Sequence, residues 1–459
     1  MKKITIVFVG VLMLAGTSLF AGSLDYLSNQ SARWVMTTSR NASLDGADIV
    51  QFNPAGTAYL AKGFHLDLSG QTLFKYYNNE DVSVGGPATI VFPSLSRSAE
   101  TLKQSYPSPL IPNMYLAYNF GEVGKGRLAA YTQVGIVAGG GELKWNGGTV
   151  GTTLLLTGIS ANSGGLLGGI KSQEFDASSI YYGVGLGVSY AFAGDMVSVS
   201  FGGRSVMANR NFGLKAVYTS SADLKGEYEY KAKGFTPIVG IDVRPTKDLT
   251  LAARFEAPTS LEFEYKQKEL GGALANTAKA ILKNAGIEDG KKARQDLPAV
   301  IGLGAGYNVT DRLTLDLSGM FYLLSSANLG DVYENTTGKK VGEVSDYFNT
   351  GWEIGLGATY KALDNLKIGA GVLYSAAGAK ETYLNDSKIA FGASGNPMLN
   401  SVTLGTGITY TRNKLDFTCS FLWSHYLPEN FSIDTGAFKV SGKYGKDALG
   451  IGYGVGYRF

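Results

Sequence analysis

Few side chains in this sequence have the type and spacing that covalent chemistry needs. The chain has two histidines, His65 and His425, and one cysteine, Cys419. A hydrolase uses a nucleophile or an activated water beside a general base, most often histidine. His65 has Asp67 on the same face of an alternating stretch, but no serine-centred nucleophile motif accompanies either histidine. The sequence therefore predicts no enzyme and no cofactor, and a single cysteine provides neither an internal disulfide nor a cysteine-based metal site.

Three arginines are the other candidates for a chemical role. Arg204, Arg244 and Arg254 lie in alternating stretches, on the more polar face of each. A guanidinium there could bind the carboxylate of a ligand. It could also pair with acidic side chains on that face, or with the segment before the first strand, as most buried charges do. The acidic candidates are Asp67, Glu256 and Glu353.

The composition favours membrane-crossing strands as the elements that position these residues. Charged residues make up 17% of the 459 residues, and there are 62 glycines. Soluble domains average about 25% charged residues and about 7% glycine. Downstream of the N-terminus, no apolar run reaches the roughly 20 residues of a membrane-spanning helix. The net charge of +3 gives no electrostatic case for a nucleic-acid partner.

The N-terminus has the three parts of a secretory signal peptide. Lys2 and Lys3 precede the apolar stretch 4–14, and small residues lead to Phe20-Ala21-Gly22. We expect cleavage after Ala21, so that residues 1–21 form the signal peptide. A transmembrane anchor is the weaker alternative, because the apolar stretch is short.

Stretches of strict alternation recur from residue 63 onward. In one of them Trp352, Ile354 and Leu356 alternate with glycine and glutamate. Successive side chains of a strand point to opposite faces, so each stretch has one apolar face and one small or polar face. In a membrane barrel the apolar face contacts lipid and the other face lines the lumen.

Connection lengths separate a barrel from a soluble sandwich. Short turns, such as 121–126 and 361–365, alternate with long connections. The long ones are predicted at 78–110, 139–178, 208–233, 266–292, 325–349, 377–399 and 425–447. Outer-membrane barrels have short periplasmic turns and long outer loops. We therefore predict an all-β transmembrane fold, an antiparallel up-and-down outer-membrane β-barrel of about 14 strands over residues 63–459.

The chain ends on an alternating strand whose last residue is Phe459. A C-terminal aromatic of this kind resembles the signal that the outer-membrane assembly machinery of bacteria reads. That machinery and outer-membrane lipid are therefore expected partners, and the bacterial outer membrane is the expected location.

Residues 22–62 do not alternate and are rich in small and polar residues. They could form a flexible tail, or an N-terminal hatch that plugs the lumen, which wide barrels commonly need. The segment ends in Asn53-Pro54-Ala55-Gly56. Proline restricts the backbone of Asn53, whose side chain can bond nearby backbone, so a rigid corner is expected between hatch and wall. A structural turn is the plainer interpretation of this motif, and a direct ligand contact is the alternative.

These motifs resemble those of a known family. Asp45-Gly46-Ala47-Asp48 followed by Asn53-Pro54-Ala55-Gly56, just before the first strand, is similar to the hatch end of the FadL/TodX/OmpP1 family. The stretches 253–263 and 297–313 are also similar, and the resemblance runs from the signal peptide to Phe459. It implies an outer-membrane transporter of long-chain fatty acids and other hydrophobic small molecules.

The resemblance also implies capture by apolar outer loops, binding in the lumen, and release through a gap at a kinked third strand. Capture candidates are Leu154, Leu155 and Leu156 in the loop 149–170, and Leu270, Leu274 and Ile281 at helical spacing. The spacing of Leu270, Leu274 and Ile281 predicts an amphipathic helix in the loop 266–292. This helix could present an apolar groove or could merely cap the barrel. Kink candidates are Gly135, Gly139, Gly140 and Gly141. A general diffusion porin and a loop-based surface adhesin remain the alternative functions.

Overall fold

The computed structural model describes residues 31–192, 194–284, 286–334 and 337–459. The predicted signal peptide, residues 1–21, lies outside the described residues, as do residues 22–30 of the predicted hatch. None of the described helices is long and apolar enough to cross a membrane.

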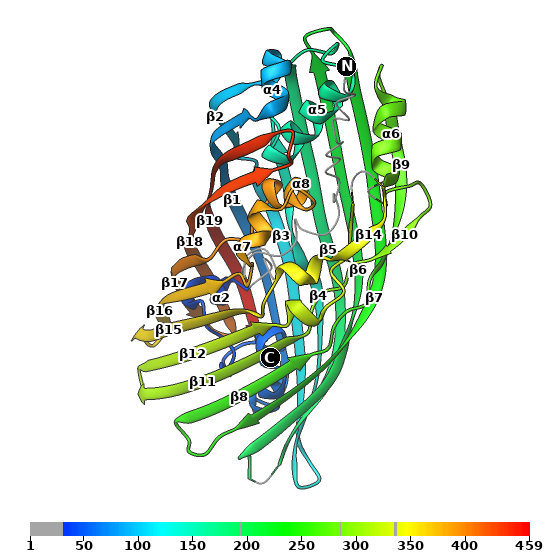
Figure 1. The fold of residues 1–459 in the computed structure, drawn as a ribbon. Helices are drawn as coiled ribbons and strands as arrows, with labels where there is room; N and C mark the ends of the chain where they lie inside the picture. Colours follow the sequence, from blue (N-terminus) through cyan, green and yellow to red (C-terminus); the bar gives the residue numbers. More distant parts are fainter. Residues whose placement is uncertain (1–30, 193, 285, 335–336) are drawn as a thin grey trace.

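The described residues form a closed antiparallel β-barrel (Figure 1). β1 pairs with β3 on one side and with β19 on the other, where His65 lies opposite Arg458, so the first and last strands close the sheet. Three barrel strands are interrupted, because β2 with β3, β8 with β9 and β10 with β11 are consecutive segments of one strand each. The 17 segments of the sheet therefore make 14 barrel strands, as predicted.

The strands of the barrel are β1 (Gly63–Gly85), β2 (Arg97–Gln104), β3 (Ser108–Val123), β4 (Gly126–Trp145), β5 (Ile170–Phe192), β6 (Val197–Tyr218), β7 (Asp223–Val243), β8 (Leu249–Glu256), β9 (Glu262–Gly271), β10 (Lys292–Arg294), β11 (Val300–Thr310), β12 (Leu313–Tyr322), β15 (Gly351–Leu363), β16 (Leu366–Ala376), β17 (Ser401–Arg412), β18 (Leu415–Asp434) and β19 (Lys439–Arg458). A small hairpin of β13 (Asp331–Tyr333) and β14 (Lys340–Glu343) lies in one outer loop.

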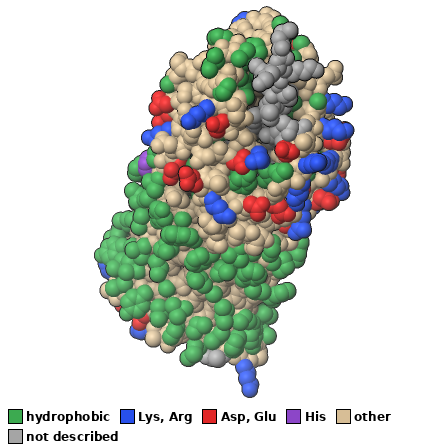
Figure 2. Space-filling view, in the orientation of Figure 1, with side chains coloured by type: hydrophobic (Ala, Val, Ile, Leu, Met, Phe, Trp, Pro, Cys, Tyr) green, Lys and Arg blue, Asp and Glu red, His purple; other side chains and the backbone are tan. Residues whose placement is uncertain are grey.

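The alternation of the sequence becomes the two faces of the wall. Leu317, Leu356 and Ile451 are each about half exposed on the outside of the barrel, at 48%, 50% and 41%. Figure 2 shows the hydrophobic side chains gathered over the half of the barrel that carries the short turns, with charged side chains over the other half. This apolar surface faces lipid, since a membrane barrel exposes its apolar residues outward.

Three of the predicted long connections are wrong. Most of 78–110 is strand, because β1 runs to Gly85, β2 lies within the range and β3 starts at Ser108. β6 runs to Tyr218 and β7 starts at Asp223, so most of 208–233 is strand. In the same way β18 and β19 occupy most of 425–447. Outward side chains such as Lys215 and Lys231 are charged there. The apolar alternation therefore stops where the wall leaves the bilayer, although backbone pairing continues above it.

Residues 31–62, which we call the hatch, lie inside the lumen at the end with the short turns (Figure 1). The hatch contains α2 (Ala32–Thr37), α3 (Ile49–Phe52) and the 3-10 helix η1 (Pro54–Tyr59). α2 packs on β15 to β19, and η1 packs on β3 to β7. Nearly every hatch residue from Ser31 to Ala58 is buried, so the hatch fills this part of the barrel.

The outer end of the barrel carries short helices. They are α4 (Pro87–Val91), α5 (Val150–Asn162), α6 (Ala275–Asn284), α7 (Glu381–Asn385) and α8 (Ala390–Gly395), with the 3-10 turns η2 (Pro93–Leu95), η3 (Leu324–Ser326) and η4 (Val344–Tyr347). α5 packs against α8 and β5, and residues Val150 to Ala161 are all buried. The predicted surface loop at 149–170 is therefore wrong over this stretch, because its apolar residues form a buried helix instead.

Candidate functional site

Glycines on the inward face of the lumen wall make room for the hatch. A β-carbon at Gly371 or Gly357 would collide with the carbonyl oxygen of Thr37. A β-carbon at Gly405 would collide with the carbonyl oxygen of Val35. The glycines of the inward face therefore leave room for the backbone of α2.

The Asn-Pro-Ala-Gly motif fastens the hatch to the opposite wall. Asn53 Nδ2 donates a hydrogen bond to Asp242 Oδ2 on β7 at 2.9 Å, rather than bonding nearby backbone as expected. The carbonyl oxygen of Ala55 accepts a bond from Ser198 Oγ on β6 at 2.7 Å. Pro54 starts η1, where its fixed φ suits a helix N-terminus and no backbone donor is lost. The motif is thus a corner that docks on two neighbouring strands.

The hatch also carries its own buried ion pairs. Asp48 Oδ1 lies 2.8 Å from Arg40 Nη2 and 3.5 Å from Arg33 Nη1. Arg33 Nη2 in turn lies 2.9 Å from Asp416 Oδ2 on β18. Because each charge has a partner, the aspartates of the Asp45–Asp48 motif hold the hatch together and tie it to the wall.

Two of the three predicted arginines are paired inside the wall. Glu256 lies between Arg204, to which it is hydrogen bonded, and Arg254, whose Nη2 is 3.3 Å from Glu256 Oε1. Arg244 lies near the end of β7, with its guanidinium 4.9 Å from the ring centre of Tyr59 in the hatch. The alternative in which these arginines pair with wall and hatch therefore accounts for their positions.

The structure brings three of the predicted capture residues together at the outer end. Leu155 of α5, Leu270 of β9 and Ile281 of α6 line one apolar cavity of about 30 Å³, which we call the helix cavity. Leu154 and Leu156 are buried within α5. α6 is amphipathic, with Ala278, Ile281 and Leu282 buried. The predicted helix is wrong at its start, because Leu270 lies in β9 and Leu274 packs against the core just before α6 begins at Ala275.

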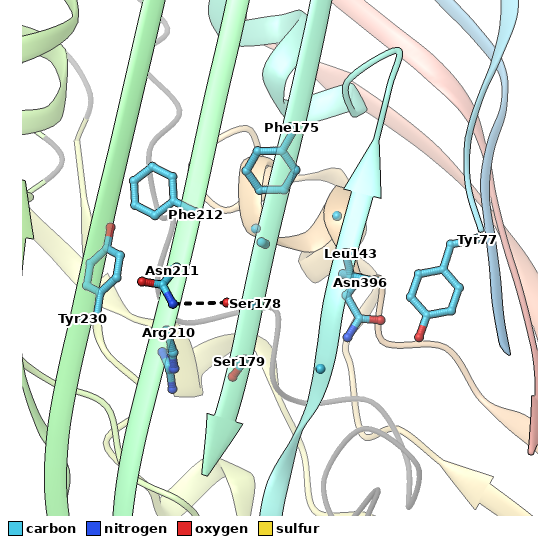
Figure 3. Close-up of a pocket in the computed structure, with 14 residues that line it drawn as sticks. Tyr77, Leu143, Phe175, Ser178, Ser179, Arg210, Asn211, Phe212, Tyr230 and Asn396 are labelled. Atoms are coloured by element: carbon cyan, nitrogen blue, oxygen red, sulfur yellow. Dashed lines mark hydrogen bonds between the residues drawn. The ribbon is translucent and has the colours of Figure 1, made fainter. Parts of the chain in front are cut away.

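A second cavity, of about 40 Å³, lies deeper in the lumen (Figure 3). We call it the arginine cavity, because Arg210 of β6 lines it together with Phe175, Phe212 and Tyr230 from β5, β6 and β7. Arg210 Nε donates to Tyr181 Oη at 2.7 Å, and its guanidinium lies 4.1 Å from the ring centre of Phe263. The cavity thus combines aromatic walls with a buried cation.

Sequence reasoning missed Arg210, although the signal was present. Arg210 has the same parity as Arg204 on β6, and both are buried on the lumen side. The predicted strand ended before residue 208, so Arg210 was assigned to a loop.

A second buried cation lies across the same cavity. Lys446 Nζ lies 2.7 Å from Asn396 Oδ1 and 4.7 Å from the ring centre of Tyr77. Asn396 and Tyr77 both line the arginine cavity. Arg210 therefore lines the arginine cavity, and Lys446 contacts two other residues of its lining.

The third barrel strand, β4, is irregular beside the arginine cavity. Its register with β5 shifts twice between Ile136 and Gly141, and Gly139 and Gly141 have φ angles of +98° and +74°. Only glycine adopts such angles without strain, so the predicted kink residues Gly139 and Gly141 occupy a bulge. Gly140 lies between them in β4. Gly135 lies just before the bulge, in regular pairing with Asn113 and Gly183.

The pairing of β4 with β3 ends where this bulge begins. Asn113 opposite Gly135 is the last pair of β3 with β4, whereas the pairing of β4 with β5 on its other side continues to Trp145. Outside the barrel, the same place is a hollow of about 910 Å³, which we call the wall hollow. Its lining includes Gly135 and Ile136 of β4 with apolar residues of the lipid-facing surface: Leu68, Leu110, Met114, Val134, Tyr182 and Val184.

The histidines have neighbours that suit structural roles. His65 Nε2 lies 2.7 Å from the carbonyl oxygen of Ala61, and His425 Nδ1 lies 2.9 Å from Asp447 Oδ1. Neither contact involves a serine. Among the described residues, no group of three or more His, Cys, Asp or Glu side chains could hold a metal ion.

A hatch-filled barrel of 14 strands with an irregular third strand matches one family of outer-membrane proteins. The family model for outer membrane protein transport proteins (OMPP1/FadL/TodX) matches residues 13–459. The chain belongs to this family. FadL/TodX proteins are outer-membrane channels for hydrophobic compounds rather than enzymes, so the barrel lies in the bacterial outer membrane and its cargo is hydrophobic.

Solved structures similar to this chain include other FadL/TodX barrels. A FadL homologue of Pseudomonas aeruginosa is 14% identical, with a TM-score of 0.65 over 96% of this chain and 99% of that chain. The toluene transporter TbuX of Ralstonia pickettii is 14% identical, with a TM-score of 0.55 over 94% of this chain and 98% of that chain. The toluene transporter TodX of Pseudomonas putida is also 14% identical, with a TM-score of 0.56 over 96% of this chain and all of that chain. At such identities the likeness shows the fold alone. No curated protein matches the sequence.

Proposed function

We propose that this protein takes up long-chain fatty acids, captured at the outer end, bound in the lumen and released sideways at β4. The observation that carries the proposal is the arginine cavity, which a buried guanidinium lines together with aromatic, aliphatic and uncharged polar side chains. The guanidinium is held in place by hydrogen bonds to Tyr181 and Gln295. A fatty acid has the same combination of an apolar chain and one anionic group. A guanidinium binds a carboxylate through charge-assisted hydrogen bonds, which are strongest in a dry site.

The proposed order of events follows the three spaces along β4 to β7. The apolar helix cavity lies at the outer end, next to the arginine cavity. Gly141 of the β4 bulge lines the arginine cavity, and Gly135 and Ile136 just below it line the wall hollow. Release into the wall hollow would keep the apolar chain out of the periplasmic water, which transfer along the hatch would not.

Equilibrium binding to the purified barrel tests the fatty-acid proposal. Oleate should bind, and Arg210→Met should weaken oleate binding by about tenfold or more, the loss expected for one charge-assisted contact. Oleyl alcohol, which has the same chain without the charge, should bind both proteins alike. Lys215→Met removes an exposed cation from the same strand and serves as the matched control. If Arg210→Met leaves oleate binding unchanged, Arg210 is not the carboxylate site.

Monoaromatic hydrocarbons are the second candidate cargo. Phe212 stacks with Tyr228 at 5.1 Å between ring centres, and Tyr230 meets Tyr265 edge-to-face at 4.6 Å, so the lumen wall here is strongly aromatic. Two of the similar structures are toluene transporters. Toluene binding without oleate binding would favour this class.

The porin alternative is tested by removing the segment in front of the barrel. The hatch fills the lumen, so deletion of residues 22–55 should sharply raise the conductance of the barrel in planar bilayers. Unchanged conductance would mean that an open water-filled path already exists beside the hatch, as in a general diffusion porin.

A further inference from the structure

Phe212 occupies a position shared by the helix cavity and the arginine cavity. Its side chain lines the helix cavity on one side and the arginine cavity on the other, and it is common to both linings. It projects inward from β6, two residues after Arg210, and is 5% exposed. Figure 3 shows its ring on the same strand as Arg210, beyond Asn211 and facing Tyr230.

Neighbouring tyrosines hold the Phe212 ring in this position. The ring of Tyr228 on β7 is nearly parallel to it, at 5.1 Å and 9°. The ring of Tyr230 lies 5.4 Å away at 30°. Offset stacking of this kind gives an aromatic ring one preferred orientation, but a side-chain rotation needs no backbone movement. The Phe212 ring therefore has one preferred position, and rotation of its side chain can move it away.

The sizes of the two cavities mean that side chains must move before cargo passes. Each cavity, at about 40 Å³ and about 30 Å³, has room for little more than one small group. A chain of many methylene groups has to occupy both spaces at once. Because Phe212 borders both, its ring lies where that chain would have to cross.

We propose that Phe212 is the gate between the helix cavity and the arginine cavity, and that the space its ring clears limits the cross-section of the cargo. This inference rests on the proposed function, since a gate matters only if hydrophobic molecules pass. A gate of this kind admits linear chains better than ring-bearing ones. Phe201 offers a matched control, because it is a phenylalanine of the same strand β6 that is 68% exposed on the outside of the barrel and lines neither cavity.

The test measures uptake of palmitate and of a pyrene-labelled decanoate into liposomes that contain the barrel. Phe212→Ala should raise the ratio of pyrenyl to palmitate uptake by about tenfold, a typical effect of one pocket side chain on selectivity. Phe212→Trp should reduce uptake of both probes. Phe201→Ala and Phe201→Trp should leave the ratio as in the wild type. Heat-modifiable migration on SDS gels identifies the variants that are folded.

The outcomes separate the gate from the proposed function. If the wild type takes up neither probe, the proposed function fails and the gate fails with it. If the wild type takes up palmitate but folded Phe212→Ala keeps the wild-type ratio, the gate alone is wrong. An equal change of the ratio in Phe201→Ala would likewise overturn the assignment of the gate to Phe212.

Discussion

At the scale of the residue, glycines on the lumen face matter as much as the polar side chains there. Glycines on the lumen face make room for the hatch backbone, and a few buried polar groups then fasten it. Charged residues inside the barrel are mostly placed in pairs, as Glu256 is with Arg204 and Arg254. Arg210 is hydrogen bonded to Tyr181 and Gln295 and also lines the arginine cavity among aromatic rings, and this position beside a cavity is why we assign it to cargo.

Filling one lumen glycine should loosen the hatch. Gly371→Val would place a side chain against the carbonyl oxygen of Thr37, and overpacking of this kind typically costs about 1–3 kcal/mol. We expect faster proteolysis of the hatch and a higher conductance. Gly319→Val, on the same barrel, should leave both unchanged, because the added carbon would meet only ordinary van der Waals contacts with Phe321 and the Glu353 carbonyl oxygen. Equal effects of the two substitutions would show that β-propensity, not the hatch contact, is responsible.

The last residue should matter for assembly more than for stability. The backbone of Phe459 pairs with β1 through a 2.8 Å bond to the carbonyl oxygen of Phe64, but its ring is 71% exposed. We propose that the assembly machinery reads this ring. Deleting Phe459 should reduce the folded fraction in cells, while the protein refolded in detergent should keep its thermal stability. A parallel loss in detergent would point to a structural role instead.

At the scale of the element, α5 shows how tertiary structure changes the meaning of a sequence stretch. Leu154, Leu155 and Leu156 predict a sticky loop when taken alone. In the barrel they form a buried helix whose N-terminal Thr149 accepts a hydrogen bond from Ser394 of α8 at 3.1 Å. Periodicity could not predict this, because α5 is apolar on all sides and its partners come from a connection more than 200 residues later. Because α5 and α8 are in contact at the outer end, we predict that they separate when cargo enters.

Locking α5 to α8 should therefore stop uptake. Thr149→Cys with Ser394→Cys, in a Cys419→Ala background, places two thiols where hydroxyl oxygens are 3.1 Å apart, which suits a disulfide. The oxidised protein should lose hydrophobic uptake, and a reductant should restore it. Oxidised single-cysteine variants serve as controls. Undiminished uptake by fully cross-linked protein would show that cargo enters without moving α5.

At the scale of the whole molecule, the outer surface of the barrel is apolar over the part that crosses the membrane and polar over the part above it. Apolar residues cover the lower outer surface, and charged residues cover the wall that rises above the bilayer (Figure 2). The wall β5 to β7 is taller than the wall β11 to β17, as strands of 23 and 11 residues show for β5 and β11. Both cavities lie against the tall wall, so the proposed cargo sites are on the side of the barrel where the strands are longest.

The four tryptophans can report this arrangement. Trp423 is 40% exposed on the lipid-facing side, whereas Trp34 of the hatch and Trp145 of β4 are 6% and 1% exposed. In vesicles of brominated lipid, a variant that keeps only Trp423 should lose much of its fluorescence. Variants that keep only Trp34 or only Trp145 should not, because bromine quenches on contact. Strong quenching of Trp34 would place the hatch outside the lumen.

Local pattern is sufficient for the architecture of this protein. Alternation depends only on neighbours along the chain, so the strands, their two faces, the strand number and the short turns follow from the residue order, and the Asn53–Gly56 motif adds the family. Contacts between distant segments are different, because they exist only after the barrel closes. The pairing of Arg204 with Glu256, the burial of α5, the seat of the hatch and the place of Phe212 between two cavities all join residues from separate strands. Arg210 lies where the wall has left the membrane. Sequence alternation did not identify it, because apolar alternation indicates contact with lipid and not the pairing of strands, which continues above the membrane.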